Sequence, residues 1–264
     1  MRARDFLEHC QSVAHWVDWA DTRDQFMAGD PAAEVRGIAT TWLATNAVLR
    51  EAASLGLNFV VAHEGAFYPT YQGTPSGDRH HAEKRRLIED LGIRLLRCHD
   101  TWDRMPEVGI PDAWARFLGF PSEPRPVDSF YRICQVGERT VAEVAHLVLE
   151  RVRPLGEEGV RIVGDPHRSV GRMAVGTGAI TRLPEMLELG ADIVLATDDG
   201  ISTTAAGLWS LDLGVPMLVV NHATAEVPGM MAMVGYIEEH FPGVPVRYVA
   251  GQFPAPVPHS QQSE

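Results

Sequence analysis

The sequence predicts an α/β protein made of two intertwined α/β/α repeats, with mostly parallel or mixed sheets and a metal site between the repeats. Three observations predict this fold. Short apolar runs alternate with segments of helical periodicity, as in sheets whose strands are buried on both faces. A strand–helix–strand pattern occurs twice in the same order. Histidines and carboxylates follow the strand ends, which is where open α/β sheets bind ligands.

Hydrophobic periodicity places the elements along the chain. Helices are predicted near residues 4–20, 44–55, 80–91, 110–118, 140–153, 179–189, 201–213 and 228–241. Strands are predicted near residues 35–41, 57–62, 93–98, 130–136, 160–163, 172–176, 192–196, 216–220 and 245–250. Three prolines between residues 120 and 126 break any helix there and mark the boundary. We therefore expect a first repeat over residues 1–124 and a second, intertwined with it, over residues 125–264.

The internal repeat aligns without gaps. Residues 55–64 read LGLNFVVAHE and residues 189–198 read LGADIVLATD. In both copies a helical stretch ends at glycine, which is a favourable C-cap, and a buried strand with a polar end follows. Further on, LGIRLL at residues 91–96 and LGVPML at 213–218 each precede a histidine and a carboxylate. Two matches in the same order predict an internal duplication.

Composition excludes several classes of protein. The chain has 264 residues, of which 45% are hydrophobic and 22% charged, and its formal net charge is -12. This acidity argues against nucleic acid or an anionic membrane as partner, because contacts with phosphate need a basic surface. The cysteines Cys10, Cys98 and Cys134 are too few and too scattered for a disulfide framework. With no apolar run near the roughly 20 residues of a membrane span and no signal-peptide core, we expect a soluble cytoplasmic protein.

Among the 23 basic residues, only Lys84 is a lysine. A phosphate-loop lysine, a Schiff base or a carbamylated bridging lysine would therefore have to be this residue. A lysine-bridged amidohydrolase barrel is disfavoured, because Lys84 lies inside a helical stretch and the eightfold strand–helix count is missing.

Imidazoles and carboxylates at the strand ends form the candidate metal site. The candidate ligands are His63, Glu64, His99, Asp103, His222 and Glu226. A spacing of four residues puts the two members of each later pair on one helix face. Such ligands suit divalent zinc, iron or manganese. Six ligands exceed the needs of one tetrahedral ion, so we expect two divalent metal ions per chain, roughly 3.5 to 4 Å apart.

A single histidine at a strand end is more often a hydrogen-bonded core residue than a ligand, and the duplicated context is what favours metal here. Two interpretations remain open for the neighbouring polar residues. Asp198 and Asp199 correspond in the second repeat to the first histidine motif, and either line the cavity or cap a helix that begins near residue 200. Asp100 and Thr101 either orient a metal-bound water or make loop hydrogen bonds.

Two further patterns favour the less specific interpretation. Gly176 and Gly178 follow a predicted strand and flank Thr177 in a pattern that can cradle a phosphate, but a tight turn is favoured because the third glycine of a dinucleotide motif is missing. His80 and His81 begin a predicted helix and are expected to be solvated.

Three segments in order carry a family resemblance: HEGAFY at residues 63–68, HDTWD at 99–103 and HATAE at 222–226. The chain resembles the NGG-one-interacting-factor-three-like proteins, also called dinuclear metal centre hexameric proteins or GTP cyclohydrolase type-two homologues. The resemblance spans residues 35–249 and implies a homohexamer with metal sites facing an internal cavity. That family normally has two adjacent histidines in the first motif, whereas Glu64 stands second here. We expect this carboxylate to favour harder ions such as manganese or magnesium, or to weaken one metal position.

Together these features predict a metal-dependent hydrolase or cyclohydrolase-like enzyme that acts through a metal-bridging water on a small molecule. A nucleotide-like substrate is implied by the resemblance alone, and the sequence identifies no general acid. The alternative is a hexameric metal-binding regulatory or scaffold assembly with little turnover, which the glutamate in the first motif favours.

Overall fold

The computed structural model describes residues 1–68, 71–126, 128–179 and 181–251. The chain divides into two compact units. The first consists of Met1–Trp114, Arg125–Phe130 and Glu226–Gly251, and the described part of the second consists of Ala115–Pro124 and Tyr131–Ala225. Both ends of the described chain thus contribute to the first unit. The division into repeats at residues 1–124 and 125–264 stays a prediction, as does the internal duplication.

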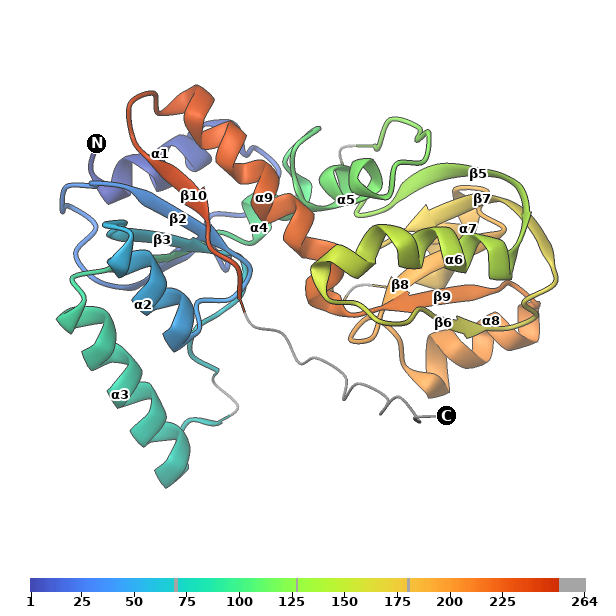
Figure 1. Cartoon of the computed structure of the whole chain (residues 1–264), viewed down its shortest axis with the longest axis horizontal. Coiled ribbons are helices and arrows are strands. Elements are labelled where there is room, and N and C mark those ends of the chain that lie inside the picture. Colours follow the sequence, from blue (N-terminus) through green and yellow to red (C-terminus); the bar gives the residue numbers. More distant parts are fainter. Residues whose placement is uncertain (69–70, 127, 180, 252–264) are drawn as a thin grey trace, which may run out of the picture. The chain divides into compact units, whose positions relative to one another are not determined.

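The first unit contains a five-stranded sheet (Figure 1). Its strands, in spatial order, are β1 (Gln25–Ala28), β4 (Arg94–Arg97), β3 (Phe59–Ala62), β2 (Ile38–Thr41) and β10 (Val246–Tyr248). Four of them are parallel and β1 is antiparallel to β4. Every residue of β2 and β3 is buried, which explains why β3 reads as a continuous apolar run and not as an alternating one.

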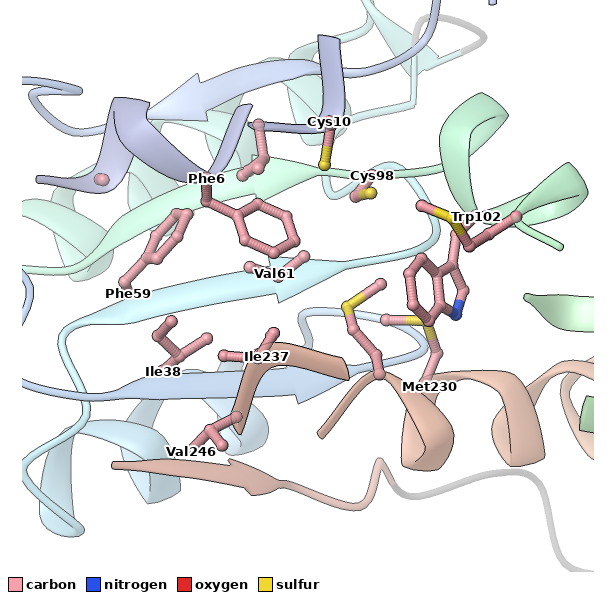
Figure 2. Close-up of a cluster of buried hydrophobic side chains, with 14 of the residues drawn as sticks. Phe6, Cys10, Ile38, Phe59, Val61, Cys98, Trp102, Met230, Ile237 and Val246 are labelled. Carbon is pink, nitrogen blue, oxygen red and sulfur yellow. The ribbon is translucent and has the colours of Figure 1, made fainter. Parts of the chain in front are cut away.

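Helices cover both faces of this sheet (Figure 1). The helices α1 (Ala3–Val13) and α9 (His222–His240) contribute Phe6, Cys10 and Ile237 to a core that also contains Phe59 and Val61 (Figure 2). The helices α2 (Asn46–Ser54) and α3 (Pro75–Asp90) pack against the opposite face. Neighbouring strand residues therefore point to different cores, as the period of two requires.

The second unit contains another five-stranded sheet. Its strands, in spatial order, are β5 (Arg132–Thr140), β7 (Ser169–Val175), β8 (Ile193–Thr197), β9 (Met217–Val220) and β6 (Arg161–Val163). The three central strands are parallel, and the two edge strands are antiparallel to their neighbours. Its helices are α6 (Val141–Val152), the short Arg153–Leu155, α7 (Leu183–Glu188), Thr203–Gly207 and α8 (Leu208–Leu213). The predicted α/β class with mostly parallel or mixed sheets is confirmed.

Several predicted boundaries were wrong. The first helix ends at Val13 and not near residue 20, and α7 begins at Leu183 and not near residue 179. The strand β1 and the short helix α4 (Asp100–Arg104) were not predicted, because each is too short to show a period. The helix α5 (Ile110–Leu118) matches its prediction.

Two helices begin earlier than predicted. The helix α9 starts at His222 and continues through Pro228, although the prediction began it at residue 228. The helix α3 starts at Pro75, where Thr74 accepts a hydrogen bond from the Gly77 N–H at 3.2 Å. Threonine as N-cap followed by proline is a recognised helix start, so the sequence carried this signal. None of the described helices is long and apolar enough to cross a bilayer.

Candidate metal centre

The strand β3 delivers His63 to the centre of the candidate site. This histidine directly follows the strand and is fully buried. Its Nδ1 lies 3.4 Å from the carbonyl oxygen of Cys98, which can only accept, so the contact favours the tautomer with the proton on Nδ1. Its Nε2 then presents a lone pair to Asp103 and Glu226, whose Oδ1 and Oε2 atoms each lie 3.3 Å away. Three distant chain segments therefore meet at one nitrogen.

The short helix α4 positions the second histidine–carboxylate pair. His99 precedes its first turn and Asp103 lies four residues later, so both side chains lie on the same face. The Asp103 Oδ2 is 3.1 Å from the His99 Nδ1, and the His63 and His99 rings stack with centroids 4.5 Å apart. The two oxygens of Asp103 thus contact two different imidazoles.

Glu226 comes from α9 and is held by an indole. The Nε1 of Trp42, just after β2, donates a hydrogen bond to the Glu226 Oε2 at 2.8 Å. Since Glu226 is almost fully buried, this bond and the contact with His63 offset part of the cost of burying its carboxylate.

Glu64 is paired with a cation of the chain itself. Its Oε2 accepts a hydrogen bond from the Arg97 guanidinium at 2.9 Å, and its Oε1 lies 4.0 Å from the His99 Nε2. The guanidinium of Arg97 therefore compensates the negative charge of Glu64. This glutamate occupies the position at which the family that the chain resembles has its second histidine.

Two overlapping groups of these side chains have ligand atoms within 4.8 Å of one another. The groups are His63, His99 and Asp103, and His63, Glu64 and Glu226. All five residues belong to the first unit, so a metal site between the two repeats stays a prediction. Ligands about 2.0–2.1 Å from a tetrahedral ion lie roughly 3.3–3.4 Å apart, and the 3.3 Å separations at His63 fit this spacing.

The electrostatics of His63 also favour a cation. Burial alone would lower the pKa of this imidazole, but the carboxylates of Glu226 and Asp103 outweigh burial and raise the pKa well above its ordinary value. In the described part of the chain its Nε2 makes no well-oriented hydrogen bond. Two negative groups thus surround a buried nitrogen that can bind either a proton or a metal ion.

His222, the sixth candidate ligand, belongs to the second unit. Its Nδ1 lies 2.9 Å from the Asp199 Oδ2, and its backbone N–H donates to the Asp198 Oδ1 at 2.9 Å. The helical segment that follows the two aspartates begins at Thr203 with Ser202 before it, and Asp198 accepts instead from the first residue of α9. Their role beside the metal centre stays a prediction. Whether His222 is a ligand stays a prediction.

The residues between the first ligands have separate roles. Asp100 Oδ1 accepts a hydrogen bond from the His99 Nδ1 at 2.8 Å, and Asp100 Oδ2 accepts from Thr22 and Arg23. This leaves the His99 Nε2 for coordination, as a carboxylate behind a ligating histidine commonly does. Thr101 is fully buried, and its Oγ1 has no hydrogen-bond partner in the described part of the chain, so its role stays a prediction.

Asp24 supports the site and was not predicted from the sequence. This buried carboxylate accepts hydrogen bonds from the backbone N–H groups of His99, Asp100 and Thr101, the last two at 2.9 and 2.8 Å. It therefore caps the start of α4 from a segment far away in the chain. An aspartate before a very short strand was the only signal in the sequence.

Two other predictions receive an answer from the described residues. Gly178 has a left-handed φ of 62°, and no helix begins until Leu183, which supports the tight-turn interpretation of Gly176–Gly178. His81 was expected to be solvated and is buried instead, with its ring edge against Phe67.

Comparisons with known proteins identify a matching family, a relative and similar folds. A family model described as Duf34/NIF3 (NGG1p interacting factor 3) matches residues 1–252. A Streptomyces coelicolor relative named GTP cyclohydrolase 1 type 2 homolog is 27% identical over 186 residues, which cover 65% of this chain and 63% of the relative. The alignment thus spans less than two thirds of that relative.

Solved structures show the same fold. A Bacillus cereus protein related to NIF3 superposes with a TM-score of 0.78 at 13% identity, covering 97% of this chain and 98% of the other. A Staphylococcus aureus hypothetical protein superposes with a TM-score of 0.75 at 17% identity, covering 96% and 97%. At such identities the likeness shows the fold alone.

Proposed function

This chain belongs to the Duf34/NIF3 (NGG1p interacting factor 3) family, and from that premise we propose that it is a metal-dependent hydrolase with a dinuclear centre. The proposed ligands are His63, Glu64, His99, Asp103 and Glu226, together with His222 as predicted from the sequence. The observation that carries the proposal is the convergence of Asp103 and Glu226 on the Nε2 of His63, each at 3.3 Å.

The arrangement supports two ions sharing one carboxylate. A single imidazole nitrogen binds one cation, so the His63 Nε2 serves one position, with Glu226 and one oxygen of Asp103. The other oxygen of Asp103 lies 3.1 Å from the Nδ1 of His99, and the Nε2 of His99 lies 4.0 Å from the Glu64 Oε1. Because its two oxygens face different imidazoles, Asp103 would be the carboxylate that contacts both ions of a two-metal site.

Divalent ions bound here would lower the pKa of a coordinated water and polarise the bond under attack. The surrounding residues hold the ligands in place. Trp42 fixes Glu226, Asp100 fixes the tautomer of His99, and the carbonyl of Cys98 fixes that of His63. Arg97 reduces the negative charge of the site and stands close enough to Glu64 to compete with an ion for it.

The substrate proposal comes from the relative's name. The Streptomyces coelicolor protein is named a GTP cyclohydrolase 1 type 2 homolog, so GTP is the first compound to test. A purine nucleotide offers a carbon or a phosphorus centre that hydroxide can attack. Formation of a homohexamer, inferred from the family resemblance, is part of the proposal and is measured by light scattering on the purified chain.

A second function fits one specific observation. The Glu64–Arg97 pair places a fixed cation beside one of the two proposed metal positions. A centre weakened in this way suits a metal-binding regulatory or scaffold assembly with little turnover. The two functions differ in catalysis and not in metal binding.

The deciding experiment combines metal analysis with an activity assay. Chelated protein is reloaded with manganese or zinc, desalted and analysed for metal per chain, and GTP consumption is followed by chromatography. Wild type should retain two equivalents, whereas Asp103→Asn should retain less than one and lose activity. Asp90→Asn, an exposed aspartate on α3, is the matched control and should behave as wild type.

The outcomes separate the proposals. Bound metal together with turnover that is lost in Asp103→Asn supports the hydrolase. Bound metal without turnover of GTP or related nucleotides supports the assembly. Failure of wild type to retain any divalent ion would contradict both.

A further inference from the structure

A cavity of the first unit lies beside α3 and shares no residue with the candidate metal centre. Its volume is about 500 Å³. Its lining includes Ser76, His80, His81 and Lys84 of α3, and Tyr68 and Tyr71 from the chain before this helix. The proposed hydrolase makes no use of these groups.

Lys84, the chain's single lysine, is the unusual feature of this cavity. It is only 5% exposed, although lysine is rarely buried without a partner. Within the described part of the chain it makes no hydrogen bond or ion pair. Burial, which disfavours the charged form, lowers its pKa to about 8. A mostly buried lysine that lines a cavity and forms no ion pair within the described residues can pair with a ligand that supplies the negative charge.

The rest of the cavity is consistent with a negatively charged ligand. None of its described lining residues is acidic, in a chain that carries 35 acidic residues. The N-terminus of the 16-residue helix α3 lies in the wall and adds the positive end of a helix dipole. The nearest carboxylate of the first turn, Asp78, is turned to the backbone N–H of Gly73 at 3.0 Å.

The described residues just before α3 approach its first turn closely. A Cβ at Gly77 would lie 2.1 Å from the carbonyl oxygen of Tyr71, so only glycine allows the loop to approach so closely. Tyr71 lines the cavity together with Leu43, Ala66 and Tyr68. Apolar and aromatic surface thus lies next to the amine.

We propose that this cavity binds a small organic anion, a carboxylate or phosphate monoester on a flat apolar body, with Lys84 as its counter-charge. The anionic group pairs with the amine of Lys84, and the apolar body packs against Tyr68 and Tyr71. The site does not depend on the metal centre or on the proposed hydrolase activity.

Calorimetry with phenyl phosphate, benzoate and inorganic phosphate tests the site on the full chain. Phenyl phosphate should bind wild type at least tenfold more tightly than it binds Lys84→Met. Arg86→Met, which removes an exposed cation from the same helix, is the matched control and should bind as wild type. Inorganic phosphate should bind more weakly than phenyl phosphate, since it lacks the apolar body.

Two further measurements locate the binding. Asp103→Asn should bind phenyl phosphate as wild type does, because the metal centre takes no part. Reductive ¹³C-methylation gives a single lysine signal in this chain, and that signal should shift on addition of phenyl phosphate while the N-terminal signal does not. Loss of binding in Asp103→Asn, equal binding by Lys84→Met and wild type, or no binding by wild type would overturn the proposal. Circular dichroism melting confirms that each variant is folded.

Discussion

The carboxylate of Asp24 accepts a hydrogen bond from the backbone N–H of Thr101 at 2.8 Å, although 77 residues separate the two in the chain. The same carboxylate also accepts from the N–H of Asp100 at 2.9 Å. A helix of five residues cannot form by itself, because nucleation costs more than its few hydrogen bonds return. The position of Asp103, the central carboxylate of the site, therefore depends on a residue that never touches the metal ligands' side chains.

Removing this cap should damage both stability and metal binding. Asp24→Ala leaves the first N–H groups of α4 without their acceptor, so we expect a loss of about 1–2 kcal/mol in the free energy of unfolding. Metal affinity should fall as well, because Asp103 loses its fixed position. Urea unfolding and metal titration measure the two effects. Asp30→Ala, an exposed aspartate of the same segment, is the control, and an equal effect of both substitutions would refute the capping role.

The indole of Trp42 should contribute to metal affinity without being a ligand. Trp42→Phe keeps the ring but removes the N–H that holds Glu226 at 2.8 Å. Residues that orient a ligand typically affect metal affinity by about 10- to 100-fold. We expect a loss in this range in competition titrations with a chelating dye. Trp209→Phe, at an exposed position, should leave the affinity unchanged.

The sequence predicted a large part of this site. His63 and His99 follow β3 and β4, two adjacent parallel strands, and the carboxyl ends of such strands meet at one edge. That rule places the two histidines together without any knowledge of side-chain packing. The spacing of four between His99 and Asp103 likewise predicted a shared helix face, which α4 provides.

Other contacts could not be predicted, because they join segments with no local signal. The pairing of Glu64 with Arg97 depends on the register of β3 and β4, and the bond from Trp42 to Glu226 links residues 184 apart. The helix α9 contains Pro228, and the predicted helix began at that residue, six residues after the observed start. Tertiary packing decided these points.

Restoring the second histidine of the first motif should change the metal preference. In Glu64→His combined with Arg97→Leu, a neutral nitrogen replaces the carboxylate, and the competing cation is removed with it. Nitrogen ligands favour zinc over manganese, so the ratio of zinc to manganese affinity should rise at least tenfold. Arg97→Leu alone serves as control. An unchanged ratio would show that residue 64 does not contact the ion.

Lys84 should make stability depend on pH in a defined window. Its pKa is about 8 in the folded chain and about 10.5 when exposed, because burial disfavours the charged form. Between these values the unfolded chain binds more protons than the folded one, so the free energy of unfolding should rise with pH. Below pH 8 the loss of folding stability caused by burying the charged amine is fully present.

Lys84→Met removes this titration, and the difference in unfolding free energy between variant and wild type should shrink as the pH rises from about 8 to 10.5. Chemical denaturation at several pH values measures it. A difference that stays constant across the window would mean that the amine is well solvated or paired.

The most direct test of the metal centre is anomalous diffraction at the metal edge from crystals loaded with zinc or manganese. The proposal predicts one peak within about 2.0–2.3 Å of the His63 Nε2, bound also by Asp103 and Glu226, and a second peak roughly 3.5–4 Å away near His99. Anomalous peaks located elsewhere, with His63 contacting only the two carboxylates, would contradict it.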